Sequence, residues 1–475
     1  MLRRWFVGLV SIVSCVGLAG LVGVPASAAE LSWDRLSGAT GVETSIAVAK
    51  HVYPAGWDTV YVASNRNPVD ALPAATIGNG PVVLTDGKAL NLGGVKPGKV
   101  VLLGGSGAVS ATIEAQAKDL VGEGNVTRLW GADRNQTAAA IARYWAKTNG
   151  VPATVYVTKN AGAGSPDAVA GSVLRDGPIV TFTSDASAVE AAAVVKELQP
   201  AKVVALGGTG SVSDANLHTV AGGLPTERLA GANRYETAFV IAQRVKAQNP
   251  NATNVYLASG TALKDAMVAG AAKDGVILLT PPNAAGVNDK ATALGAQQIH
   301  VIGGTGVVPE NTAKTAAGDP AALAAQAKAQ VKADAIATAQ AQGLDVYEGT
   351  IRILDRLQDC KASQEYWPMS CDSEGSLQYY ETSGANRIAR LMLDSPQIVY
   401  GYYCEGGGPY SGTVASLSLA GDNENPRFSE ATAYDGKRVV IAVDRRFLLL
   451  SEMYPPVGPG LAYAGAKNLN VIWSE

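Results

Sequence analysis

The sequence predicts three tandem α/β domains, each built on a small parallel sheet, followed by a smaller α+β domain. The same series of landmarks occurs three times in the first two-thirds of the chain. Within each copy the expected strands are short and apolar without alternation, as is typical of a parallel sheet covered on both faces. The segments between these strands are rich in alanine and long enough to form crossover helices.

The landmarks define a repeat of domain size. Each copy begins with Arg-Leu-x-Gly-Ala and soon reaches a threonine that opens a helical pattern. An apolar strand, an Asp-Ala pair, a second apolar strand and a third strand ending in two glycines then follow in the same order. Such long-period self-similarity indicates a domain array. We expect a signal segment at 1–29, repeats at 30–118, 119–219 and 220–318, an Ala-rich helical linker at 319–345 and a C-terminal α+β domain at 346–475.

The N-terminus has the features of a secretory signal peptide in the usual order. Arg3 and Arg4 precede a long apolar run, which Pro25 interrupts before an Ala-Ser-Ala site. Two alternatives stay open, namely an uncleaved membrane anchor and a lipoprotein-type site at Cys15. We see no other membrane-spanning stretch and no sortase-type motif, so we expect non-covalent retention after export.

Composition and charge narrow the class of protein. Apolar residues make up 47% of the chain and charged residues 17%, which predicts a folded protein. A net charge of −3 argues against a general nucleic-acid binder, which would show a basic surplus.

A family resemblance rests on the repeated motif. The sequence from Arg128 to Thr137 is RLWGADRNQT, and the sequence from Arg228 to Thr237 is RLAGANRYET. Together with the Asp-Ala pair, the double glycine and the three copies, this pattern resembles the cell-wall-binding repeat 2 family over about residues 30–315. The resemblance implies Rossmann-like or Toprim-like domains packed around a pseudo-threefold axis. It also implies a non-covalent anchor for anionic secondary polymers of the wall, beside a variable domain.

The arginines of the motif are the candidates for polymer binding. The planar guanidinium bonds two oxygens of a phosphate or carboxylate at once. Alternatively, each arginine pairs with a repeated aspartate and braces the fold. Gly41 replaces the second arginine in the first copy, which weakens any arginine-based site there. The candidates are Arg35, Arg128, Arg134, Arg228 and Arg234.

Three aspartates, Asp70, Asp167 and Asp265, also recur. Each precedes an Ala-rich stretch, so we expect helix N-capping, with a catalytic acid as the weaker alternative. The glycine-rich turns after the third strands lack the Walker lysine and the full Gly-x-Gly-x-x-Gly pattern, so we expect tight turns and no nucleotide site. The sequence predicts no catalytic residue, no metal site and no cofactor.

The C-terminal region resembles no family that we recognise. No histidine follows His300, which excludes the usual Cys-His catalytic site and a His-ligated zinc site there. In an exported chain a disulfide is expected, and Cys360–Cys371 is favoured because it closes a short loop, while pairings with Cys404 stay open.

These observations predict a secreted surface protein whose repeats bind the Gram-positive cell wall. The expected partner is an anionic wall polysaccharide or a teichoic-acid-like polymer, with no nucleic acid and no membrane span once the signal is removed. One alternative is a wall-targeted hydrolase with its catalytic site in the C-terminal domain, using carboxylates such as Glu365, Asp372 or Glu381. Another is a structural surface-layer protein.

Overall fold

The computed structural model describes residues 30–159, 165–355, 387–403, 409–421, 427–443, 448–450, 462–464 and 470–475. The chain divides into two compact units, 1–323 and 324–475. The expected signal segment lies outside the described residues. So do the three C-terminal cysteines, among them the expected pair Cys360 and Cys371, and the carboxylates Glu365, Asp372 and Glu381.

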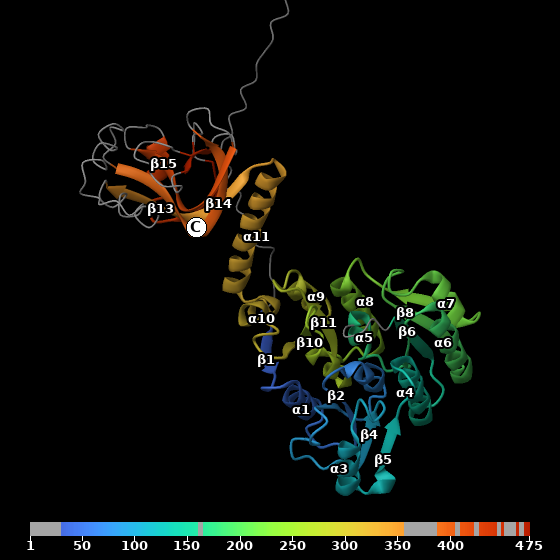
Figure 1. Ribbon diagram of the computed structural model, residues 1–475. Coiled ribbons are helices and arrows are strands. Elements are labelled where there is room, and N and C mark those ends of the chain that lie inside the picture. Colours follow the sequence, from blue (N-terminus) through green and yellow to red (C-terminus); the bar gives the residue numbers. More distant parts are fainter. Residues whose placement is uncertain are drawn as a thin grey trace, which may run out of the picture. The chain divides into compact units, whose positions relative to one another are not determined.

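The first unit contains three four-stranded parallel sheets, which confirms the predicted α/β class (Figure 1). Their strand orders are β3-β2-β4-β5, β7-β6-β8-β9 and β1-β12-β10-β11. The first sheet consists of β2 (Thr59–Ser64), β3 (Val82–Thr85), β4 (Lys99–Leu103) and β5 (Val126–Leu129). The second consists of β6 (Thr154–Lys159), β7 (Ile179–Phe182), β8 (Lys202–Leu206) and β9 (Thr226–Leu229). The third consists of β10 (Asn254–Ser259), β11 (Gly275–Thr280), β12 (Gln298–Ile302) and β1 (Ser32–Leu36).

The fourth strand of each sheet comes from another repeat. The Arg-Leu segment that opens the second repeat is β5, and it pairs with β4 of the first repeat. In the same way β9 pairs with β8, and β1 from the start of the chain pairs with β12 of the third repeat. Figure 1 shows β1, drawn in blue, beside the yellow strands of the third repeat. Three such strands serve three sheets, so the repeats form a closed ring.

Helices fill the connections, as the Ala-rich segments predict. The helix that follows each Arg-Leu strand is long and begins just after the motif. These three helices are α1 (Gly41–Val52), α4 (Arg134–Asn149) and α8 (Arg234–Gln248). The other helical segments of the ring are η1 (Pro68–Asp70), α2 (Ala71–Ala75), α3 (Ala111–Val121), η2 (Glu123–Asn125), α5 (Pro166–Gly171), α6 (Asp185–Leu198), α7 (Asp214–Ala221), η3 (Asp265–Ala271), α9 (Val287–Ala293) and α10 (Glu310–Ala317).

The central strand of each sheet carries a fully buried tyrosine with a fixed partner. The hydroxyl of Tyr156 donates to Asp176 at 2.7 Å, and that of Tyr256 donates to Asp274 at 2.9 Å. In the first repeat the hydroxyl of Tyr61 donates to the side-chain oxygen of Asn79 at 2.7 Å. A buried hydroxyl needs such a partner because leaving it unbonded costs free energy. The repeat is therefore preserved at the level of individual hydrogen bonds.

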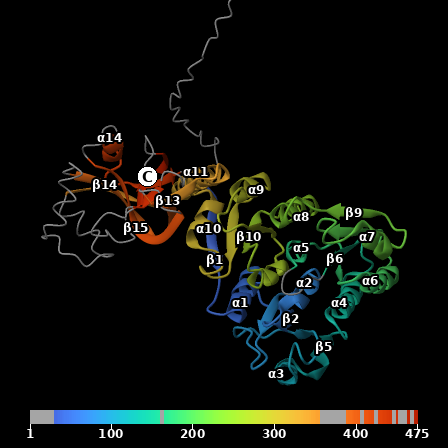
Figure 2. The same cartoon turned by 45° about the horizontal axis from the view of Figure 1, so that its top comes forward.

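The short helices α2, α5 and η3 contact one another between the three sheets, near the middle of the ring in Figure 2. Arg175 lies among them and donates to the carbonyl oxygens of Gly270 and Ala272 at 2.7 and 2.6 Å. Burial lowers the pKa of Arg175 to about 10. A Cβ at Gly270 would lie 2.2 Å from the hydroxyl of Ser172, so only glycine fits there. This centre joins the second and third repeats directly.

The second unit has a mainly antiparallel sheet, in agreement with the α+β expectation. Its strand order is β15-β18-β17-β14-β13-β16-β19, with a further pairing of β15 with β14. Its strands are β13 (Asp345–Asp355), β14 (Arg387–Tyr403), β15 (Pro409–Gly421), β16 (Arg438–Val443), β17 (Leu448–Leu450), β18 (Ala462–Ala464) and β19 (Val471–Ser474). Its core includes Tyr347, Ile351, Leu391 and Phe428. The helices are α14 (Arg427–Thr432) and α11 (Pro320–Ala341), which begins in the first unit. None of the helices in the described ranges is both long and apolar enough to cross a bilayer.

Ring closure through β1 makes a testable prediction about the chain start. A protein that begins at residue 38 lacks β1, which leaves one edge of β12 unpaired and uncovers apolar side chains beneath it. We expect its thermal midpoint to fall by about 5 °C or more relative to a chain that begins at residue 30. Differential scanning calorimetry of the two proteins measures the difference. Equal midpoints would show that the third sheet does not depend on β1.

Candidate functional site

Equivalent polar groups gather where the carboxyl end of one sheet meets the start of the next repeat. We call these places junction sites one, two and three. In open α/β folds this edge of the sheet is the usual place for ligands. Junction site one comprises Asp70, Gly104, Arg128 and Arg134; site two comprises Asp167, Gly207, Arg228 and Arg234; site three comprises Asp265, Gly303, Arg35 and Gly41.

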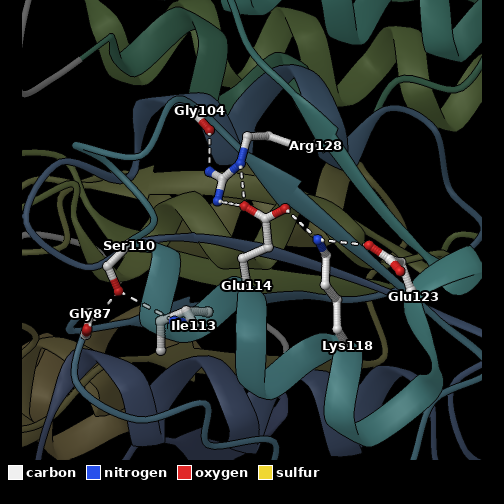
Figure 3. Close-up of polar contacts among 8 residues, drawn as sticks. All are labelled: Gly87, Gly104, Ser110, Ile113, Glu114, Lys118, Glu123 and Arg128. Carbon is white, nitrogen blue, oxygen red and sulfur yellow. Dashed lines mark hydrogen bonds and ion pairs between the residues drawn. The ribbon is translucent and has the colours of Figure 1, made fainter.

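The first arginine of each motif binds the preceding repeat. Arg128 donates to the carbonyl oxygen of Gly104 at 2.8 Å, and it pairs with Glu114 at 2.8 Å (Figure 3). Figure 3 also shows Lys118 reaching the other oxygen of Glu114. Only 14% of the Arg128 side chain is exposed. Its guanidinium is therefore occupied within the protein.

Junction sites two and three repeat this arrangement. Arg228 donates to Gly207 at 2.8 Å and pairs with Asp214 at 2.8 Å. Arg35 donates to Gly303 at 2.8 Å, but its pair with Glu310 is longer, at 3.5 Å. The acidic partners lie in the first turns of the helices after the Gly-Gly turns, not at the repeated aspartates. The first arginines therefore pair with acids of the fold, as the bracing alternative expects, but these acids are Glu114, Asp214 and Glu310 and not the repeated aspartates.

The second arginine is placed differently. Arg134 and Arg234 are the first residues of α4 and α8, and each acts electrostatically on the aspartate of the preceding repeat. Arg134 is half-buried and, among the described residues, makes no hydrogen bond or ion pair. Arg234 is exposed and donates to the carbonyl oxygen of Gly260 at 2.6 Å. Arg134 therefore keeps all its guanidinium donors unbonded within the described chain, and Arg234 keeps all but one.

Junction site three lacks this cation. Gly41 occupies the first position of α1, and a Cβ there would lie 2.6 Å from the side-chain oxygen of Asn65 and 3.6 Å from Asp265. The end of the Asn65 side chain therefore lies where an arginine stem would begin. The departure noted in the sequence is therefore a structural one, and the three junction sites differ in charge.

The repeated aspartates do not cap helices as expected. Asp70 precedes α2 without a side-chain capping bond, while Asp167 and Asp265 lie inside the first turns of α5 and η3. Burial raises the pKa of Asp70 to about 6, against the opposing charge of Arg134. Burial also raises the pKa values of Asp167 and Asp265. Each carboxylate instead packs against the first glycine of a Gly-Gly turn.

The remaining motif residues shape the start of each repeat. The backbone N–H of Gly131 donates to the hydroxyl of Thr137 at 3.1 Å, and that of Gly231 donates to Thr237 at 3.0 Å. A Cβ at Gly131 would lie 2.3 Å from that of Gln136, so the turn needs glycine for close approach to the helix. The threonine and glycine thus fix the turn that leads into the helix, whose first residue is the second arginine.

An open groove lies beside the second repeat's motif. It encloses about 420 Å³ and is lined by α4, β7 and α6, with polar groups from Asn135, Gln136, Thr181 and Glu190. Trp130 forms one wall, 59% exposed, and its ring lies 3.8 Å from the place of a Cβ at Gly105, the residue after Gly104 of junction site one. An exposed aromatic ring beside polar groups suits the face of a sugar.

Sequence reasoning did not select Trp130. The available signal was its position in the motif, because the equivalent residues are the small Ser37 and Ala230. A large apolar residue at a turn where the other copies have small ones suggests a role beyond folding.

The comparisons with known proteins agree with this architecture. The model of the family described as cell wall binding domain 2 (CWB2) matches residues 35–114, 128–217 and 228–313, which is more than half of the chain. Each matched range begins at the first arginine of a repeat.

Individual relatives share part of the chain. N-acetylmuramoyl-L-alanine amidase LytC of Bacillus subtilis (strain 168) is 29% identical over 264 residues, which are 54% of this chain and 50% of the relative. The solved structure of Cwp6 from Clostridium difficile has a TM-score of 0.50 and 22% identity, over 60% of this chain and 48% of that one. Cwp8 from the same organism has a TM-score of 0.48 and 23% identity, over 61% and 52%. The chain thus spans about half the length of each.

The first glycine of each Gly-Gly turn should be intolerant of a side chain. Gly207 has φ +102°, and a Cβ there would lie 2.2 Å from the carboxylate of Asp167. We expect Gly207→Ala to lower the free energy of unfolding by about 2 kcal/mol or more in urea titration. Gly208→Ala is the matched control, because its Cβ would meet nothing within 4 Å. Equal losses in the two variants would contradict the proposed packing.

The raised pKa of Asp70 predicts a pH-dependent stability. Between about pH 4 and pH 6 the folded chain retains a proton that the unfolded chain releases, so stability falls as pH rises through this window. Asp70→Asn avoids the cost of a buried charge, and we expect it to be more stable than the parent at pH 7.5 by on the order of 2 kcal/mol. The advantage should shrink at pH 4.5.

Urea unfolding at the two pH values measures this effect. Asp119→Asn serves as the control, since Asp119 is exposed on α3. A gain that is the same at both pH values would show that the carboxyl of Asp70 does not titrate in this window.

Proposed function

The chain belongs to the cell wall binding domain 2 family, and from this premise we propose that it is a secreted protein held non-covalently on the Gram-positive wall by anionic secondary polymers. The family supports attachment to the wall and a location at the cell surface. We further propose that repeats at 30–118, 119–219 and 220–318 form the anchor. The domain at 346–475 is then displayed beside them, after the helical linker at 319–345.

The observation that carries the polymer assignment is the charge at junction sites one and two. The first arginines, Arg128 and Arg228, are already bonded to acids and carbonyl oxygens, so they are not the main ligands. Arg134 and Arg234 keep guanidinium donors that no described residue bonds. Burial raises the pKa values of the aspartates beside them, and Asp70, whose pKa is about 6, carries less negative charge near and below that pH. Phosphate or carboxylate groups of a wall polymer would meet a locally positive site.

The groove beside junction site one adds contacts for the sugar part of a polymer. Trp130 offers an exposed ring, and the polar residues of the groove offer hydrogen bonds to hydroxyl groups. A chain of alternating sugar and anionic groups could therefore bind the groove and Arg134 together. This arrangement favours a polysaccharide or a teichoic-acid-like polymer over a simple anion.

The relation to LytC supports the anchoring role. That relative is an amidase by name, and its similarity to this chain lies in the repeat region. We therefore propose that the anchor is shared and that the C-terminal unit has a different, non-catalytic role. Turbidity of purified walls tests the alternative, because a wall hydrolase would lower it and a binding protein would leave it unchanged.

A pull-down on isolated walls tests the binding proposal. The chain of residues 30–475 should sediment with untreated walls, and it should stay in solution after acid extraction has removed the anionic polymer. Equal sedimentation before and after extraction would exclude the anionic polymer as the ligand.

The arginines can be tested in the same assay. We expect Arg134→Ala with Arg234→Ala to reduce the wall affinity about tenfold or more, because two charge-assisted contacts are lost. The thermal midpoint should fall only slightly, since Arg134 bonds nothing in the described chain and Arg234 only one carbonyl oxygen, which leaves the attraction for Asp70 and Asp167 as the main loss.

Two control variants separate binding from folding. Lys147→Ala with Lys196→Ala removes the same charge from exposed positions of the second repeat and should bind like the parent. Arg128→Ala should lower the thermal midpoint, because it opens the pair with Glu114. A large loss of stability in the Arg134/Arg234 variant would show these arginines to be structural.

A further inference from the structure

A cluster of metal-binding side chains lies where the first and third repeats meet. Asp34 on β1, His51 near the end of α1 and His300 on β12 each present one ligand atom, and these atoms lie within 4.8 Å of one another. A ring nitrogen of His300 lies 2.7 Å from a carboxylate oxygen of Asp34. The rings of His51 and His300 are 4.2 Å apart between centroids. Two of the three histidines in the chain thus meet across a sequence separation of about 250 residues.

The fold does not require these residues. The strand pairing that joins Asp34 to His300 joins Thr127 to Val101 at the first junction and Glu227 to Val204 at the second. The helix position of His51 is occupied by Tyr144 in α4 and by Arg244 in α8. The three equivalent residues at the first junction are therefore uncharged. At the second junction they include an ion pair between Arg244 and Glu227. A buried histidine on the strand occurs at the third junction alone.

His300 is buried and keeps one ring nitrogen without a partner, while its Nδ1 atom contacts Asp34. The residue is 2% exposed, and its Nε2 atom has no hydrogen-bond partner. Leaving a buried polar atom unbonded costs about 1–3 kcal/mol. Asp34 keeps 44% of its side chain exposed, so an ion can reach the cluster from solvent.

We propose that Asp34, His51 and His300 bind a divalent transition metal such as Zn²⁺ and so fasten the first repeat to the third. Two imidazole nitrogens and one carboxylate oxygen suit zinc, whereas calcium and magnesium prefer sites made of oxygen atoms. Three protein ligands leave a coordination position for water. The metal would hold β1 and α1 against β12, at the contact that closes the ring.

The ligand atoms must move closer together to bind the ion. Zinc ligands at about 2.0–2.2 Å from the metal lie about 3.3 Å from one another in a tetrahedral site. The present spread of up to 4.8 Å between ligand atoms is larger than this, and Asp34 and His51 are the two partly exposed ligands that would have to adjust. His300 is already fixed by the strand and by its contact with Tyr256 at 5.1 Å between ring centroids. Gln298 steadies the carboxylate of Asp34.

Zinc titration of the chain of residues 30–475 tests the proposal. All samples are stripped with a chelator, and their cysteine thiols are alkylated so that thiolates cannot compete for the metal. Isothermal titration calorimetry with ZnCl₂ should give one site per chain. Saturating Zn²⁺ should also raise the thermal midpoint, since a ligand that binds only the folded state stabilises it.

The other repeats supply variants that the fold already accommodates. His300→Val and His51→Tyr introduce the residues found at the first junction, Val101 and Tyr144. Each should weaken zinc binding at least roughly tenfold and abolish the zinc-dependent rise in midpoint. Asp34→Thr, which introduces the residue type of Thr127, is a third variant should either of the others fail to fold.

His218→Asn is the matched control, because it removes the remaining histidine, which is exposed on α7. It should bind zinc like the parent. The proposal is overturned if the parent shows no zinc binding, or if the His300 and His51 variants bind as tightly as the parent. Either result would assign the cluster to ordinary packing, like the Arg244–Glu227 pair. Wall binding is measured separately, so neither outcome affects it.

Discussion

Exchange of the Arg-Leu strand between repeats is the constraint on which the other features depend. Each sheet is completed by a strand from a neighbouring repeat, so no single repeat can form its own four-stranded sheet. The arginine on that strand then lies against the Gly-Gly turn of the sheet that it completes, where it bonds a carbonyl oxygen. The junction sites are consequences of this exchange, because every one of them takes its groups from two repeats.

The sequence predicted the strands and helices within each repeat better than it predicted which strands of different repeats pair. The period, the short apolar strands and the Ala-rich helices follow from local patterns, which a reader of the chain can see. The exchange could not be seen, because the pattern around Arg128 is compatible with a strand but does not say which sheet it joins. The contact of Asp34 with His300 is of the same kind, since 266 residues separate them. Only the closing of the ring brings them together.

The motif combines two kinds of residue that sequence alone does not separate. Gly131 and Thr137 are needed for the turn, as their contact and the lack of room for a Cβ show. Arg128 also serves the fold, through Glu114 and Gly104. Arg134, only six residues after Arg128, makes no hydrogen bond or ion pair with the described residues. Burial and bonding, rather than recurrence in the motif, therefore distinguish structural arginines from candidates for binding.

The three junctions differ in ways that suit the separate roles proposed for them, namely polymer binding and closure of the ring. Junction site one has an unbonded arginine and lies beside the exposed Trp130, whereas junction site three has Gly41 in place of that arginine, with the side chain of Asn65 where the stem would begin. The third junction is also the one closed by β1, which pairs with a strand more than 260 residues further along the chain. Its partner for Arg35 is the most distant of the three, at 3.5 Å. A junction with a weaker arginine pair gains most from a second link between β1 and β12, and Asp34 and His300 lie on those two strands. The polymer binding proposed for the first two junctions and the closure of the ring at the third are thus compatible roles for copies of one unit.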